Sequence, residues 1–319
     1  MKVSFIIPVY NNANTLSNTV ESILKQKTNQ ALEIIIIDDG STDNPAERLA
    51  KLFSENKNIK LFRQKNKGEA AALNAALAHC EGEFVALIES DVELEEGWLT
   101  KVTREFDCPS IMGVGGHLVT AQDDSWIARI AGYEIELKFK NKPHCTKHIT
   151  SANAIYRKEA FNKIGRFNEN LLNAALDADF NSRIINCGYK LIYVENALAI
   201  HHFKSTLLGF LKRQYAYARY RVFLPKAELY PLDRWFLLNT LLTGMCILTL
   251  AIRPLTIFIL FLFLLLTLQI GFACILLKIK KDPAIILYPL ISILRNIVVV
   301  FGISIGLINK TKAYLTVKA

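Results

Sequence analysis

The chain has 319 residues and a formal net charge of +9, so it can fold into one sizeable core with an appended region. The excess of Lys and Arg suits a membrane surface or an anionic ligand such as a nucleotide diphosphate. Nucleic-acid binding is disfavoured, because the sequence contains no helix-turn-helix, RNA-binding aromatic motif or zinc-finger spacing. The six cysteines form no C-x-x-C pair, which predicts reduced thiols in a cytosolic compartment.

The first two thirds of the chain alternate between strand-like and helix-like segments. Only Lys2 precedes the first apolar run and Pro8 ends it, so we expect a strand there rather than a signal peptide, with the soluble part in the cytosol. The alternation predicts a doubly wound α/β sheet with helices on both faces. The expected strands are 3–9, 34–38, 59–63, 84–89, 111–119, 151–157 and 190–194, and the expected helices are 14–25, 46–53, 69–79, 98–106, 126–139 and 177–187.

The last third is dominated by Leu, Ile, Phe and Val and is expected to be a membrane domain. Segment 255–277 is apolar, carries no charge and is long enough to span a bilayer. Segment 236–252 is at the lower limit of length and is expected to be either a span or a buried helix. Segment 284–308 contains Arg295, which predicts either a span with a partnered arginine or a helix lying in the membrane interface.

Between these parts, basic and aromatic residues alternate along the segment 204–224. This mixture favours an amphipathic helix at the membrane interface, although a packed helix with snorkelling arginines has the same pattern. We therefore divide the chain into a catalytic domain (1–203), an interface segment (204–234) and a membrane domain (235–319) with two or three hydrophobic helices. The lysines at 278–281 favour a cytoplasmic catalytic domain, while the side of the C-terminus stays open.

Two carboxylates end the second expected strand. Four successive isoleucines, residues 34–37, predict a strand buried on both faces of a parallel sheet. Ligands of such sheets bind beyond the carboxyl ends of the strands, where Asp38 and Asp39 can accept hydrogen bonds from a base or ribose and Gly40 permits close approach. A helix N-cap formed by Asp39 or Ser41 is the alternative, but a cap requires only one such residue, so we favour the ligand site.

A second acidic pair follows the fourth expected strand. Glu89 and Asp91 are two residues apart, and residues at i and i+2 of a strand share a face. Their oxygens are therefore expected to hold one Mg²⁺ or Mn²⁺ ion. His201 follows the strand-like run 191–200 and is a candidate third ligand or diphosphate contact, although a packing role for His201 or His202 is about equally favoured.

Six pieces of the sequence occur in a characteristic order. They are Ile7-Pro8-Val9-Tyr10-Asn11; Asp38-Asp39-Gly40-Ser41-Thr42-Asp43; Asn66-Lys67-Gly68 with Asn74; Glu89-Ser90-Asp91; the stretch 154–167; and Leu176-Asp177-Ala178-Asp179-Phe180 with Arg183. With these pieces, the first two thirds of the chain resemble the family-2 glycosyltransferases of the GT-A fold. The resemblance implies a mixed, mostly parallel sheet with helices on both faces, to which this chain adds C-terminal transmembrane helices.

The resemblance also implies a nucleotide-diphospho-sugar donor, a divalent metal (Mn²⁺ or Mg²⁺) and transfer with inversion to a hydroxyl or phosphate oxygen. Asp91, helped by Glu89 and with His201 as the candidate third ligand, would hold the metal. Asp177 would be the general base. Lys67 would contact phosphate, although a loop lysine is more often simply solvated. The donor-binding residues implied are Pro8, Tyr10, Asn11, Asp38, Asp39, Lys67, Gly68 and Ser90.

Three positions depart from the family pattern. Glu89 replaces the first aspartate of the D-x-D motif but can still ligate a metal. Asn12 stands where the family usually has an acid. Leu176 replaces the glutamate that precedes the base, which removes a polar partner of Asp177 and leaves Asp179 as the fallback base.

We therefore expect a membrane-associated inverting glycosyltransferase on the cytoplasmic side of the cell (inner) membrane, multi-pass, with a lipid-linked or glycan acceptor in envelope polysaccharide or glycolipid synthesis. Its partners would be the nucleotide-sugar donor, the acceptor and membrane lipids. One alternative is transfer to polyprenyl phosphate itself. Another is a non-catalytic nucleotide-sugar-binding subunit of an envelope assembly complex. A purely structural membrane protein fits least, because it has no need for acids at two strand ends.

Overall fold

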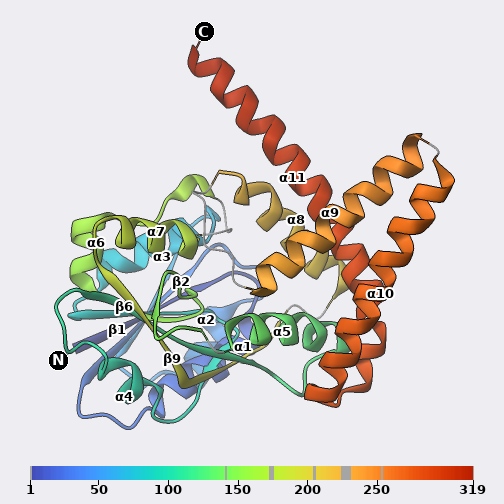
Figure 1. Ribbon diagram of the computed structural model, residues 1–319. Coiled ribbons are helices and arrows are strands. Elements are labelled where there is room, and N and C mark those ends of the chain that lie inside the picture. Colours follow the sequence, from blue (N-terminus) through green and yellow to red (C-terminus); the bar gives the residue numbers. More distant parts are fainter. Residues whose placement is uncertain are drawn as a thin grey trace. The chain divides into compact units, whose positions relative to one another are not determined.

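The computed structural model divides the chain into two compact units (Figure 1). The first consists of Met1–Thr120 and Phe139–His202, and the second of Ala121–Lys138 and Phe203–Ala319. The structure describes residues 2–140, 142–171, 176–203, 206–223, 231–252 and 254–318. Within the expected interface segment, residues 204–205 and 224–230 therefore lie outside the described part.

A nine-stranded mixed sheet forms the centre of the first unit. Its order is β3-β2-β1-β4-β8-β6-β9-β5, and β7 pairs with β9. Strands β1 to β4, β6 and β9 run in one direction and β5, β7 and β8 in the other, so the sheet is mostly parallel, as expected. The strands are β1 (Lys2–Val9), β2 (Ala31–Asp38), β3 (Ile59–Arg63), β4 (Phe84–Ile88), β5 (Val92–Leu94), β6 (Ile111–Thr120), β7 (Cys145–Thr146), β8 (Asn153–Arg157) and β9 (Lys190–His201).

Helices cover both faces of this sheet (Figure 1). Alternate residues of a strand point to opposite faces, so Val3 and Phe5 of β1 pack with Leu16 and Trp98 in one apolar core. On the other face, Tyr156 and Phe180 belong to a group of closely packed aromatic rings. The helices on the first face are α1 (Ala13–Leu24), α2 (Pro45–Phe53) and α4 (Trp98–Thr103), and those on the second are α3 (Glu69–His79), α6 (Lys158–Ile164) and α7 (Leu176–Asn186), with the short η1 (Glu169–Leu171) beside α3.

The expected strands and helices of this unit are present, with bounds that shift by a few residues. β9 is longer than the expected 190–194 and takes in the strand-like run to residue 200. The sequence did not predict β5 or β7, because strands of three and two residues are too short to show a period, and it did not predict the seven-residue helix α6 that directly follows β8.

The topology brings several chain segments to one edge of the sheet. β1, β2 and β4 are neighbouring parallel strands, so the residues that follow them emerge at the same edge. β8 runs antiparallel to β4, with Asn153 opposite Ile88, so the start of β8 lies at that edge too. The carboxyl end of β9 also arrives there, because β9 is parallel to β6 and β6 is antiparallel to β8.

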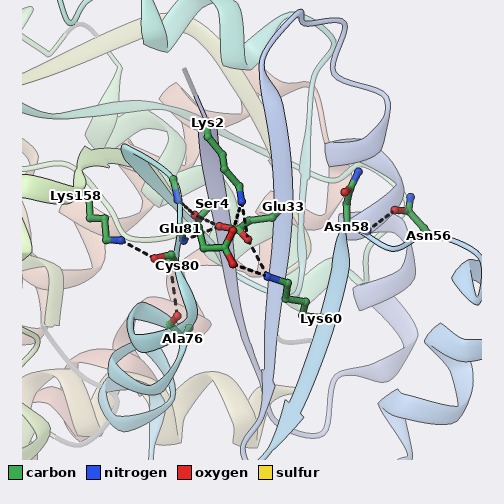
Figure 2. Close-up of polar contacts among 11 residues, drawn as sticks. Lys2, Ser4, Glu33, Asn56, Asn58, Lys60, Ala76, Cys80, Glu81 and Lys158 are labelled. Carbon is green, nitrogen blue, oxygen red and sulfur yellow. Dashed lines mark hydrogen bonds and ion pairs between the residues drawn. The ribbon is translucent and has the colours of Figure 1, made fainter.

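The opposite edge is held together by a buried glutamate. The Glu33 carboxylate accepts hydrogen bonds from Ser4 Oγ at 2.6 Å and from the Glu81 backbone N–H at 2.7 Å, and it lies 3.4 Å from Lys2 Nζ and 3.2 Å from Lys60 Nζ (Figure 2). Burial alone would raise the pKa of this carboxyl, but the hydrogen bonds and the lysines outweigh it and lower the pKa to about 2.

Glu33→Gln should therefore destabilise the sheet at neutral pH. The depressed pKa makes the ionised glutamate stabilising above its unfolded value of 4.5, and this stabilisation is lost as the pH falls toward 2. We expect a loss of about 3 kcal/mol at pH 7. Hydrogen exchange of β1 and β2 in the detergent-solubilised full chain should be faster in the variant at pH 7 and should converge with wild type near pH 2. A difference that is independent of pH would contradict this role.

In the second unit, one helix from the middle of the sequence packs with the C-terminal helices. This helix is α5 (Trp126–Phe139), whose Ile130 and Tyr133 share an apolar cluster with Phe272 and Tyr288. The other elements are α8 (Leu207–Arg221), α9 (Pro231–Ile252), α10 (Leu255–Lys280), η2 (Pro283–Leu287) and α11 (Tyr288–Lys318). Among the residues that the structure describes, three segments are long and apolar enough to cross a membrane: Asp233–Ile252, Leu255–Lys280 and Pro283–Lys312.

Arg295 has a charged partner, as expected if its segment is a membrane span. Its guanidinium forms an ion pair with Glu134 of α5, and it donates a hydrogen bond to Ser292 Oγ at 2.7 Å. Both charged side chains are buried. A paired arginine inside a candidate span is far less costly than an isolated one. Three further ion pairs join α5 to the C-terminal part of the chain: Lys138–Asp233 of α9, Glu136–Lys280 of α10, and Arg129–Asp282 just before η2.

Helix α8 is packed along part of its length against α11. Gly306 permits the approach, since a Cβ there would lie 2.4 Å from the Arg219 carbonyl oxygen. Leu208 is 63% exposed and Tyr217 is 37% exposed. Helix α8 is therefore a packed helix that also exposes apolar side chains. Its location at the membrane interface is a proposal.

Candidate functional site

Two carboxylates and one imidazole converge at the carboxyl edge of the sheet. His201 Nε2 lies 3.6 Å from Glu89 Oε2 and 3.5 Å from Asp91 Oδ1. One potential ligand atom from each of the three residues lies within 4.8 Å of the others. Asp91 and His201 are buried, and Glu89 is partly exposed. This set fits a divalent cation, since carboxylates suit Mg²⁺ and Mn²⁺ and the imidazole nitrogen favours Mn²⁺ over the strongly oxygen-preferring Mg²⁺.

The expected reason for this convergence was wrong. Glu89 and Asp91 do not share a face of one strand, because β4 ends at Ile88 and both residues lie in the short connection to β5. The Val92 N–H closes this turn on the Glu89 carbonyl oxygen at 3.2 Å. Pairing of β5 with β9 then sets Val92 opposite His201 and so brings the imidazole to the two acids.

The neighbouring histidine points to a different acid. His202 Nε2 lies 3.0 Å from Glu93 Oε1, outside the cluster of Glu89, Asp91 and His201. Consecutive residues at a strand end face opposite sides, so only one histidine of the pair can join the cluster. His201 is therefore the better candidate ligand.

Asp39 organises the loop between β3 and α3. Its carboxylate accepts hydrogen bonds from the backbone N–H of Lys67 at 2.9 Å and of Gly68 at 2.8 Å, and from Gln64 Nε2 at 2.7 Å. The Lys67 side chain is exposed. The structure thus shows a backbone role for Lys67 and Gly68, while contact of either residue with a nucleotide remains a proposal.

Asp38 and Ser41 shape the loop after β2. Asp38 Oδ1 accepts the Ser41 backbone N–H at 2.8 Å, and Arg63 Nε lies 3.5 Å from Asp38 Oδ2. The N-cap alternative is wrong for this loop, because α2 begins at Pro45 with Asn44 in the cap position. Gly40 has φ +80°, and a Cβ there would lie 2.9 Å from the Asn66 backbone nitrogen, so a glycine is required.

The loop after β1 is tied to both acidic loops. Asn11 donates its backbone N–H to Ser41 Oγ at 3.0 Å, and its Oδ1 accepts the Thr42 N–H at 2.8 Å. Asn12 Nδ2 donates to Ser90 Oγ at 2.9 Å. Tyr10 is 52% exposed, and Pro8 is partly exposed at the end of β1. The expected donor-binding residues therefore lie on loops that are joined to one another.

Asp177 and Asp179, in the first turn of α7, have different surroundings. Asp179 Oδ2 forms a close ion pair with Arg183 at 2.8 Å, which in turn donates to the Ile164 and Arg166 carbonyl oxygens. Asp177 Oδ1 accepts the Ala178 N–H at 2.7 Å, and its Oδ2 lies 3.6 Å from His148 Nε2. Because the Asp179 carboxylate is already paired with Arg183, Asp177 is the better candidate for the base.

His148 was missed by sequence reasoning, and it is a polar neighbour of Asp177, which Leu176 cannot be. It lies between β7 and β8 and reaches Asp177 only through the fold. No spacing in the sequence connects two residues 29 positions apart. A histidine shortly before an expected strand carries no distinctive signal.

The mixed, mostly parallel sheet with helices on both faces has the GT-A fold. Two solved structures have the same fold. One is a mannosyltransferase from Pyrobaculum calidifontis, PcManGT in complex with GDP-Man and Mn²⁺, with a TM-score of 0.62 at 15% identity. The match covers 94% of this chain and 86% of the mannosyltransferase chain. GalNAc-T7 with UDP, GalNAc and Mn²⁺ has a TM-score of 0.54 at 16% identity, covering 73% and 53%.

The sequence comparison identifies the family. Residues 4–165, slightly more than half of the chain, match the model of glycosyl transferase family 2, and the chain belongs to this family. It is also similar to the pre-mycofactocin glycosyltransferase of Mycobacterium tuberculosis, at 30% identity over 222 residues. That match covers 67% of this chain and 46% of the relative, so the chain spans less than half the length of this relative.

Proposed function

We propose that this protein is a membrane-anchored, metal-dependent inverting glycosyltransferase that moves a hexose from a nucleotide-diphospho-sugar to a lipid-linked acceptor. The observation that carries the proposal is the cluster of Glu89, Asp91 and His201 at the carboxyl edge of the sheet. The Mn²⁺ in the two solved structures of the same fold supports it. The three candidate spans support an acceptor that is itself held in the membrane.

Each part of the reaction has a candidate group in the chain. Glu89, Asp91 and His201 would hold the cation, which supplies positive charge against the leaving diphosphate. The loops after β1, β2 and β3 would hold the base and ribose. Asp177 would take the proton of the acceptor hydroxyl while that oxygen bonds to the anomeric carbon. The bond to the diphosphate breaks with its electron pair leaving on the nucleotide, so the configuration inverts.

Mass spectrometry of lipids tests this function. The full chain in membranes is incubated with lipid extract, Mn²⁺ and a panel of nucleotide sugars, with Asp91→Asn as the negative control. The proposal predicts one lipid class that gains the mass of a hexose with wild type only. If the sugar is released to water or joins a soluble glycan, the acceptor assignment is wrong. If no donor is consumed, a non-catalytic nucleotide-sugar-binding role replaces the enzyme.

A further inference from the structure

A chain of buried and partly buried polar groups leads from the core of the first unit to Asp177. Tyr156 OH donates to Asn181 Oδ1 at 3.0 Å. Asn181 Nδ2 lies 3.2 Å from His148 Nδ1, and His148 Nε2 lies 3.6 Å from Asp177 Oδ2. Asn181 is one helical turn after Asp177 on α7, so both side chains are on the same face of that helix.

The contacts of Asn181 fix its orientation. Asn181 Nδ2 lies 2.6 Å from the Ile149 carbonyl oxygen, which can only accept, so this atom must be the amide nitrogen. Tyr156 donates from the other side, and burial, with a contribution from the Asp177 charge, raises the pKa of Tyr156 well above its usual value and keeps its proton in place. Asn181 therefore has both its oxygen and its nitrogen assigned.

The orientation of Asn181 decides which nitrogen of His148 carries the proton. Because an amide N–H of Asn181 faces Nδ1, Nδ1 of His148 accepts, and the ring proton of the neutral imidazole is on Nε2. Nε2 is the atom that faces the Asp177 carboxylate.

Two further contacts are made with the backbone and the ring of His148. Lys142 Nζ donates to the His148 carbonyl oxygen at 3.0 Å. The ring stacks near Phe139, with centroids 6.1 Å apart. The His148 side chain is 28% exposed and that of Asp177 is 21% exposed, so the pair is partly shielded from water.

We propose that His148 is a positioning residue for the catalytic base, presenting its Nε2–H to Asp177 Oδ2 so that the carboxylate is held toward the acceptor. The inference rests on the proposed function of Asp177. The Ala178 N–H already holds Oδ1 at 2.7 Å, and His148 Nε2, at 3.6 Å from Oδ2, is placed to restrain the second carboxylate oxygen. His148 takes the place of the polar partner that Leu176 does not supply.

Two substitutions of His148 separate positioning from packing. His148→Met fills similar space without a donor, and we expect kcat to fall about 10-fold to 100-fold with the KM for the nucleotide sugar changed less than about threefold. His148→Gln carries an amide N–H at the end of a chain long enough to reach Asp177 and should recover most of that kcat. The control is His144→Met on the other side of β7, where an exposed histidine faces Glu105 at 3.0 Å and no effect on kcat is expected.

The outcomes distinguish this inference from the function on which it rests. If Asp177→Asn keeps its turnover, the base is misassigned. If Asp177→Asn loses turnover and His148→Met does not, only the role of His148 is refuted. Equal losses in His148→Gln and His148→Met, or a large rise in the sugar-donor KM in both, would show a packing role and also overturn the inference. Circular dichroism and thermal unfolding of each detergent-solubilised variant establish that it is folded.

Discussion

Asp91→Asn should reduce turnover by about 10³-fold, because it removes one charge from the cluster expected to hold the metal, and metal stabilisation of a leaving group is worth several kcal/mol. Asp91 is 5% exposed and lies 3.5 Å from His201 Nε2. An amide at this position keeps the shape of the site while weakening the binding of the cation. The measurement is the rate of sugar transfer as Mn²⁺ is varied. The variant should require a higher Mn²⁺ concentration and should remain slow at saturation.

Glu93→Gln is the matched control for this substitution. Glu93 is an acid two residues further along the chain, and it faces His202 instead of the cluster. Its loss should leave the Mn²⁺ dependence unchanged. If Asp91→Asn and Glu93→Gln behaved alike, or if wild-type transfer were insensitive to removal of divalent ions by a chelator, the cluster would not be the metal site.

Asp177→Asn has the second large expected effect. General-base catalysis contributes about 10²-fold to 10⁴-fold, so kcat should fall within that range. The nucleotide sugar should still bind with nearly its original affinity, because Asp177 is assigned to the acceptor side. Steady-state transfer assays together with calorimetric binding of the nucleoside diphosphate separate the two quantities.

Asp179→Asn provides the comparison within the same helical turn. Asp179 is engaged by Arg183 at 2.8 Å, so its substitution should lower stability slightly and leave most of the turnover. The reverse pattern, an active Asp177→Asn and an inactive Asp179→Asn, would transfer the base assignment to Asp179.

The parallel part of the fold was predictable from the sequence because its signal is local. The isoleucine run of β2, the helical spacing of α1 and the alanine-rich sequence of α3 determine their elements with little help from distant residues. The same holds for α10, whose apolar stretch is long enough to cross a bilayer.

The assembly of the site was predictable only in part. Glu89 and Asp91 were identified as a pair, but the turn that joins them and the β5–β9 pairing that adds His201 depend on a strand of three residues. His148 reaches Asp177 through tertiary packing alone. Likewise, Arg295 was recognised as costly in a membrane, while its partner Glu134 lies 161 residues away, on a helix that the sequence assigned to the catalytic domain.

The most direct test is the location of Mn²⁺ by anomalous diffraction from crystals of the full chain grown with a nucleoside diphosphate. One anomalous peak should lie among Glu89, Asp91 and His201, with the diphosphate oxygens completing its coordination. A bound nucleotide with the anomalous peak on other residues, or with none, would contradict the proposal.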